Sequence, residues 1–341
     1  MPFRDIAGHQ RLIALLERSI AHDSLPPSLL FTGPSGVGKR LTAVAVAQAL
    51  NCNAVVETGG PGAATARDAC GKCPACARIA RGVHPDVIVV EPGESGSIKV
   101  DDVRDVIDRA AYRPFEGRRR VVIVDGADAL VPHAQNALLK TLEEPPPSSV
   151  FILVTPRPDT LLPTVRSRCP ELRFRPLSSA DVAAALVARG MKEADAHAVA
   201  ALAGGSLGVA LAASAGDLAE ARDIARRVLA HAASTADPGR RLEGARELLA
   251  KTGAGGATDR EQLASHLRAL ASLLRDVEVL ATGADAAVLA HPDLRADLQP
   301  LARTFSGERG VAAYAAVDRA LVSLERNAGV KVVADWILLQ L

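Results

Sequence analysis

The chain has 341 residues, of which 48% are hydrophobic and 23% charged, a composition typical of folded globular proteins that excludes global disorder. This length exceeds one core of ordinary size, so we expect two or three domains. Lys and Arg total 40 and Asp and Glu total 39, and the net charge of +1 leaves no bulk field for attracting nucleic acid or an anionic membrane. Aromatic residues make up only 3%, which argues against a base-stacking surface for single strands.

The N-terminal segment lacks the charged-then-apolar order of a signal peptide. No apolar run approaches the roughly 20 residues that are needed to cross a bilayer. These two observations predict a cytoplasmic protein. Five cysteines in such a protein favour metal binding or reduced thiols over a disulfide framework.

The first half of the chain alternates short apolar runs with helical patterns, which predicts an α/β domain with a parallel sheet and crossover helices. The runs expected to be buried strands are residues 28–32, 86–91, 120–124 and 150–154. The segments expected to be amphipathic helices are residues 10–21, 39–50, 100–111 and 134–142.

The run GPSGVGKR follows the first strand directly and opens a helix, as a phosphate-binding P-loop does. The residues expected to cradle and contact phosphate are Gly33, Gly36, Gly38 and Lys39. The next position should hold Mg²⁺ through a Ser or Thr hydroxyl but is Arg40, and Thr42 lies about 200° further round the helix. We therefore expect the P-loop fold with weak or absent ATP. A glycine turn that no longer holds nucleotide is the alternative.

The run VVIVD at residues 121–125 predicts a strand that ends in an acid, Asp125, near the place of a bound metal. In a hydrolytic site a Glu usually follows and orients the attacking water. Here Gly126 follows. Asp128 lies two residues later and could orient the water only by an indirect geometry. The chain is therefore expected not to hydrolyse ATP itself.

Four of the five cysteines lie close together in the sequence: Cys52, Cys70, Cys73 and Cys76. Four thiolates fill the tetrahedron that Zn²⁺ prefers and leave no open position, which predicts a structural zinc site. An iron–sulfur cluster and free buried thiols are the alternatives, and a colourless protein would favour zinc. Cys169 stands apart and is expected to be a small buried hydrophobe.

From Ser178 onward Ala, Leu, Arg and Glu dominate, and no segment alternates as a strand would. Ser178 is placed to cap a helix, and Gly204-Gly205 is expected to interrupt the helices that follow. Beyond about residue 217 the sequence predicts a helical bundle. One of its apolar stripes is formed by Leu263, Leu267, Leu270, Leu273 and Leu274.

Several motifs resemble the clamp-loader branch of the AAA+ ATPases of bacterial DNA polymerase III, and most closely its delta-prime type. They are the P-loop, the cysteine module, the box Phe3 to His9, His84-Pro85-Asp86, Asn136 to Pro146 and Ser167-Arg168-Cys169. The match covers about the first 210 residues and is specific there, whereas the remainder matches mainly in its helical character.

The resemblance implies three parts: an AAA+-like domain at residues 1–175 with a zinc module at 52–76, a helical lid at 176–216 and an all-α collar at 217–341. It implies that the collar joins a hetero-pentamer with delta and gamma or tau subunits. That assembly would open the sliding beta clamp and place it on primed DNA as part of the DNA polymerase holoenzyme.

By the same resemblance Arg168 is an arginine finger that acts in trans on a neighbour's ATP. Thr155 falls at the first sensor position, and Gly208 stands where active relatives have the second sensor's arginine. These features imply a rigid stator with little or no ATPase activity. A hydrolysing motor subunit is the alternative, which Arg40, Gly126 and Gly208 oppose, and a small-molecule P-loop kinase is a more remote one.

Simpler interpretations exist for several of these residues. Arg168 could be an ordinary surface arginine in a turn. Arg118 to Arg120 could contact DNA phosphates, but a solvated strand start is the favoured interpretation. Glu143 and Glu144 are expected to end a helix before Pro145, and His84 is expected to be a turn residue rather than a metal ligand.

Overall fold

The computed structural model describes residues 1–54, 56–58, 66–93, 95–212, 214–235, 237–249, 257–283, 289–325 and 328–341. The chain forms two compact units, Met1–Leu177 and Ser178–Leu341. The first unit ends at Leu177, and the predicted domain boundary at about residue 175 stays a prediction. The second unit contains both the expected lid and the expected collar, so their separation stays a prediction.

A five-stranded sheet with the order β4-β5-β6-β1-β7 forms the centre of the first unit, and all of its strand pairs are parallel. The strands are β1 (Ser28–Thr32), β4 (Val87–Val90), β5 (Arg120–Asp125), β6 (Ser149–Thr155) and β7 (Glu171–Arg173). The four predicted runs are confirmed as strands. The edge strand β7 was not predicted, because three residues with two exposed side chains carry no apolar pattern.

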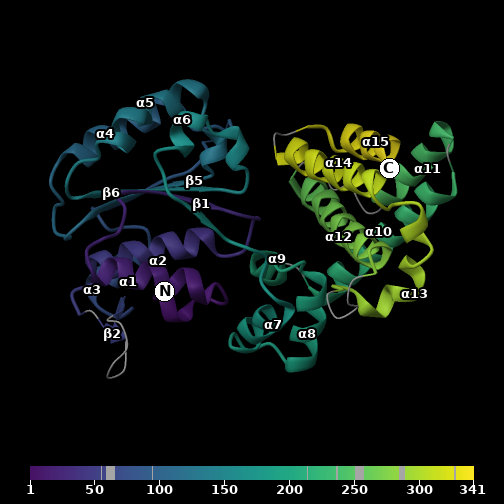
Figure 1. The fold of residues 1–341 in the computed structure, drawn as a ribbon, viewed down its shortest axis with the longest axis horizontal. Coiled ribbons are helices and arrows are strands. Elements are labelled where there is room, and N and C mark those ends of the chain that lie inside the picture. Colours follow the sequence, from purple (N-terminus) through teal and green to yellow (C-terminus); the bar gives the residue numbers. More distant parts are fainter. Residues whose placement is uncertain are drawn as a thin grey trace. The chain divides into compact units, whose positions relative to one another are not determined.

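Helices cover both faces of this sheet, as Figure 1 shows. The helices of the first unit are α1 (Gln10–Ala21), α2 (Lys39–Asn51), α3 (Pro74–Ala80), α4 (Val100–Ala111), α5 (Pro132–Glu143) and α6 (Pro163–Arg166). Successive strand residues point to opposite faces, so Leu29 and Phe31 pack with α1 and α2 while Leu30 packs with α4 and α5. The unit is therefore an α/β domain with a parallel sheet, as the sequence predicts.

A small hairpin lies between α2 and α3. Its strands β2 (Val56–Thr58) and β3 (Ala66–Asp68) pair antiparallel. The described part of this unit also contains short 3₁₀ turns at Phe3–Asp5, Ala127–Ala129 and Pro158–Thr160.

The elements described in the second unit are all helical, as the sequence predicts. Its α-helices are α7 (Ser179–Val187), α8 (Glu193–Leu202), α9 (Leu207–Ala212), α10 (Ala215–Ser234), α11 (Pro238–Leu248), α12 (Ala257–Ala281), α13 (Arg295–Leu298), α14 (Glu308–Glu325) and α15 (Val330–Gln340), with 3₁₀ turns at Pro292–Leu294 and Leu301–Arg303. The Ser178 side chain accepts a hydrogen bond from the Asp181 N–H and caps α7, which confirms the predicted cap. Gly204 and Gly205, both with positive φ, separate α8 from α9.

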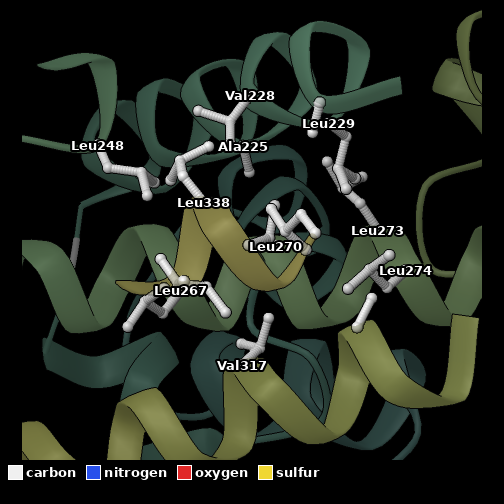
Figure 2. Packing of buried hydrophobic residues seen from close by; sticks show 14 of the residues in the cluster. Ala225, Val228, Leu229, Leu248, Leu267, Leu270, Leu273, Leu274, Val317 and Leu338 are labelled. Atoms are coloured by element: carbon white, nitrogen blue, oxygen red, sulfur yellow. The ribbon is translucent and has the colours of Figure 1, made fainter. Parts of the chain in front are cut away.

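The largest apolar cluster of the second unit joins helices α10 to α15. The predicted leucine stripe of α12 is fully buried in it, and Figure 2 shows four of these leucines facing the neighbouring helices. The same cluster contains Val228 and Leu229 of α10, Leu248 of α11, Val317 of α14 and Leu338 of α15. Among the described residues, no helix is long and apolar enough to cross a membrane.

Candidate nucleotide site and cysteine cluster

The carboxyl ends of four parallel strands meet at one edge of the sheet, where ligands bind in folds of this type. The P-loop follows β1 and Glu91 follows β4, while β5 ends in Asp125 and β6 in Thr155. In the sheet register Thr32 lies beside Thr155, and Asp125 lies beside Val154. The structure therefore brings the residues predicted for nucleotide binding to a common edge: Gly33, Gly36, Gly38, Lys39, Asp125 and Thr155.

The P-loop backbone has the conformation that its glycines permit. Gly33, Gly36 and Gly38 have φ values of 133°, 75° and 102°, and Gly38 begins α2. A Cβ atom on Gly33 would lie 2.2 Å from the carbonyl oxygen of Phe174, so no side chain fits there. The N-terminal box adjoins this loop, because the His9 Nε2 atom lies 2.9 Å from the Val37 carbonyl oxygen.

Lys39 is held by its own loop. It is 6% exposed, and its Nζ donates hydrogen bonds to the carbonyl oxygens of Gly33 at 2.7 Å and Pro34 at 2.6 Å. Burial lowers the Lys39 pKa to about 8, although the carboxylates of Asp125 and Asp128 oppose this shift. A phosphate would have to compete with two carbonyl groups for this ammonium.

Arg40 points at the acids that follow β4 and β5. One guanidinium nitrogen lies 3.0 Å from Asp125 Oδ2 and also contacts Glu91 Oε1. Mg²⁺ requires a near-octahedral set of oxygen ligands. Here a cationic donor occupies the Asp125 carboxylate and no hydroxyl follows Lys39, so these residues do not fit a magnesium ion. The sequence analysis missed Glu91 as a site residue, because it read Glu91 as the last residue of the predicted strand 86–91, whereas β4 ends at Val90.

Asp128 is bound by two side chains and is not placed to activate water. Thr155 Oγ1 donates to one of its oxygens at 2.9 Å, and Arg157 Nε donates to the other at 3.0 Å. Gly126 has a φ of 78°, a left-handed conformation that would strain a glutamate at that position. Arg157 is a second residue that the sequence analysis missed, since nothing in its local pattern pointed to Asp128.

Arg168 lies at the other edge of the sheet. It precedes β7, and its partner Glu143 ends α5 before β6 begins, so both residues are at the amino ends of the strands. Its Nε and a terminal nitrogen donate to Glu143 Oε2 at 3.0 and 2.8 Å, and another nitrogen donates to the Thr164 carbonyl. Arg168 therefore cannot reach the P-loop of its own unit. Gly208, the remaining predicted position, lies in α9 of the second unit.

The four clustered cysteines converge on one point. Their Sγ atoms all lie within 4.8 Å of one another, and those of Cys52 and Cys73 are 3.9 Å apart. A tetrahedral site with metal–sulfur distances of about 2.3 Å has sulfur atoms about 3.8 Å apart, so the four thiols could hold a metal ion. Burial opposes ionisation of Cys73, but hydrogen bonds from the N–H groups of Cys76 and Asn53 outweigh it and lower the Cys73 pKa to about 6.

The first unit matches a known protein family. A model of the family described as DNA polymerase III, delta subunit, matches residues 8–178, a segment that runs from the N-terminal box to the end of the first unit. The chain belongs to this family.

Similar proteins include bacterial clamp-loader subunits. DNA polymerase III subunit delta' of Pseudomonas aeruginosa is 39% identical over 181 residues, which are 52% of this chain and 52% of that protein. DNA polymerase III subunit gamma/tau of Mycobacterium tuberculosis is 37% identical over 173 residues, 51% of this chain and 28% of that protein. The chain thus matches about half the length of the first relative and less of the second.

Among solved structures, a DNA polymerase III gamma subunit-related protein of Thermotoga maritima covers 95% of this chain and 97% of its own, with a TM-score of 0.38 and 18% sequence identity.

In this member of the DNA polymerase III delta family, the cysteine module is attached to the N-terminal box. Asp68 is fully buried and accepts hydrogen bonds from the N–H groups of Phe3 at 2.9 Å and Ala69 at 2.7 Å. The Gln48 side chain of α2 donates to the Cys76 carbonyl at 2.8 Å. The contacts of Asp68 with Phe3 and of Gln48 with Cys76 join residues far apart in the sequence, and sequence patterns gave no sign of them.

The segment His84-Pro85-Asp86 has a structural role. Asp86 is fully buried and accepts hydrogen bonds from the N–H groups of Phe115, Glu116 and Gly117 at 2.6, 2.9 and 2.8 Å. The Arg120 guanidinium donates to it at 3.0 Å. His84 Nδ1 accepts from the Asp86 N–H, and the cysteine cluster does not include this imidazole. The motif therefore fixes the loop between α4 and β5.

The arginines at the start of β5 are bound within the unit. Arg118 donates to the carbonyl oxygens of Leu50 and Cys52, Arg119 pairs with Asp23, and Arg120 is buried beside Asp86. These contacts favour a structural role over a DNA-phosphate role. Cys169 is buried, and burial raises its pKa to about 12, as expected of an unreactive apolar side chain.

Proposed function

We propose that the chain is the delta-prime subunit of the DNA polymerase III clamp loader, a largely non-hydrolysing stator that helps load the sliding beta clamp onto primed DNA. One observation carries the proposal. At the P-loop edge a cationic side chain, Arg40, pairs with the acid Asp125, while Arg168 lies at the opposite edge with an exposed acid as its partner. The P-loop edge is therefore unsuited to Mg·ATP, and the opposite edge can present Arg168 to a neighbouring subunit.

The proposed partners are the gamma or tau and delta subunits in a hetero-pentamer, with the beta clamp and primed DNA bound through the assembly. Residues 217–341 would form the collar that joins the subunits, and residues 176–216 would form a lid. The apolar cluster of α10 to α15 supports a separate collar, because it is a core that draws on no residue before Ile224.

The proposed role is tested by assaying ATP hydrolysis and clamp loading. We expect the chain alone to show no DNA-stimulated ATP hydrolysis, and Lys39→Ala to change nothing. Added to gamma or tau and delta subunits, the chain should be required for loading of the beta clamp on primed DNA. Turnover by the chain alone that Lys39→Ala abolishes would instead identify a gamma-like motor, the second candidate, which the similarity to gamma/tau subunits favours.

We propose that the metal held by the four cysteines is zinc in a structural role. Elemental analysis of the purified chain should find one zinc ion and no iron, and the protein should be colourless. Cys73→Ser should lose the zinc and lower the melting temperature of the first unit, because metal binding contributes directly to folding. Cys169→Ala is the control and should retain the zinc. A brown protein with bound iron, or a chain without metal, would contradict this assignment.

A further inference from the structure

Arg40 places a positive charge between two carboxylates at the carboxyl ends of adjacent strands. Val90 of β4 pairs with Val124 of β5, so the residues that come next, Glu91 and Asp125, lie side by side. The Arg40 guanidinium contacts both of these acids through the same nitrogen. The side chains of Arg40 and Glu91 are about half exposed and that of Asp125 is 24% exposed, so the three groups line an accessible edge.

The acidic side chains at this edge explain what the positive charge of Arg40 does there. Asp128 is neutralised by Arg157, which leaves Glu91 and Asp125 as two negative charges. Two neighbouring carboxylates with open oxygens would attract a divalent cation. The guanidinium supplies positive charge there permanently, because arginine does not deprotonate in proteins. The Thr42 hydroxyl does not replace the missing ligand, since Thr42 is fully buried and its Oγ1 donates to the Gly38 carbonyl at 3.0 Å.

We propose that the Arg40 guanidinium takes the place of the divalent cation at this P-loop. It holds Asp125 and Glu91, excludes Mg²⁺, and makes any binding of a nucleoside triphosphate independent of Mg²⁺. This inference goes beyond the proposed stator role and rests on it in one respect, because both use the pairing of Arg40 with Asp125.

The test measures binding of a fluorescent ATP analogue to the full chain, in excess Mg²⁺ and in EDTA. Wild type should show the same affinity in both buffers, or no binding in either. Arg40→Ser frees both carboxylates and supplies a hydroxyl, so its affinity should be about tenfold or more higher in Mg²⁺ than in EDTA. Arg40→Lys keeps the charge and should behave as wild type. Arg18→Ser, an exposed arginine on α1, is the surface control and should also behave as wild type.

Electron paramagnetic resonance of Mn²⁺ provides a second measurement. In the presence of ATP, Arg40→Ser should bind Mn²⁺ and wild type should not. Wild-type binding that improves about tenfold in Mg²⁺ would overturn the proposal. So would an Arg40→Ser chain with an unchanged melting temperature that binds neither Mn²⁺ nor nucleotide in a metal-dependent way. Magnesium-dependent binding by wild type would also weaken the expectation that the chain does not hydrolyse ATP. Clamp loading and the effect of Arg168→Ala are measured on the assembly, so failure here is distinguishable from failure of the proposed function.

Discussion

Arg168→Ala in the reconstituted clamp loader should slow ATP hydrolysis by about 10³-fold or more at the one site that this arginine serves. The reason is electrostatic, because the guanidinium would stabilise charge that develops on the transferred phosphoryl group of the neighbouring subunit. The measurement is single-turnover ATP hydrolysis by the assembly with primed DNA and the beta clamp. Assembly itself should be unchanged by gel filtration.

The present partner of Arg168 does not prevent this role. The side chains of Arg168 and Glu143 are 31% and 60% exposed, and an exposed ion pair of this kind contributes only about 0.2–1 kcal/mol. Arg168→Lys keeps the positive charge but loses the bidentate donor geometry of the guanidinium, so ATP hydrolysis should also be slow in this variant. The matched control is Arg166→Ala, which removes a neighbouring arginine that pairs with the exposed Asp159. Unchanged hydrolysis in Arg168→Ala would remove the finger role.

Asp86→Asn should lower the free energy of unfolding of the first unit by about 3–5 kcal/mol, the effect of breaking a buried ion pair at one partner. The amide would leave the buried Arg120 guanidinium without a counter-charge and would weaken three backbone hydrogen bonds. Urea unfolding followed by circular dichroism measures the change. Asp159→Asn removes a carboxylate from an exposed pair and should cost less than about 1 kcal/mol. Equal effects of the two variants would contradict this account of Asp86.

The same residue predicts a dependence of stability on pH. Burial raises the pKa of Asp86, but hydrogen bonds from the N–H groups of Glu116, Gly117 and Phe115 and from Arg120 outweigh it and lower the pKa to about 2. The unfolded pKa is about 3.9, so Asp86 contributes about 2–3 kcal/mol of stability that is complete above about pH 5 and is lost as the pH falls through about 2. In Asp86→Asn this part of the acid dependence should be absent.

Local patterns predicted much of the fold. Four strands and the strand–loop–helix of the P-loop were found because their apolar runs and glycines lie together in the sequence. The cysteine cluster was found for the same reason. By contrast, the contact of Arg40 with Glu91 and that of Asp68 with Phe3 join residues that only the folded sheet brings together. The sequence showed that Arg40 stands where a P-loop has a Ser or Thr hydroxyl. That its guanidinium lies between two carboxylates followed only from the register of β4 against β5.

Phe174 gives the phosphate-binding loop a mechanical connection to the end of the first unit. Its N–H donates to the Thr32 carbonyl at 2.8 Å, its carbonyl oxygen leaves no space for a side chain on Gly33, and its ring packs edge-on against His9. The first unit ends shortly afterwards, at Leu177. Because protein interiors are close-packed and transmit strain, a shift of Gly33 must displace Phe174 as well. The position of the P-loop is thereby coupled to the last residues of the first unit.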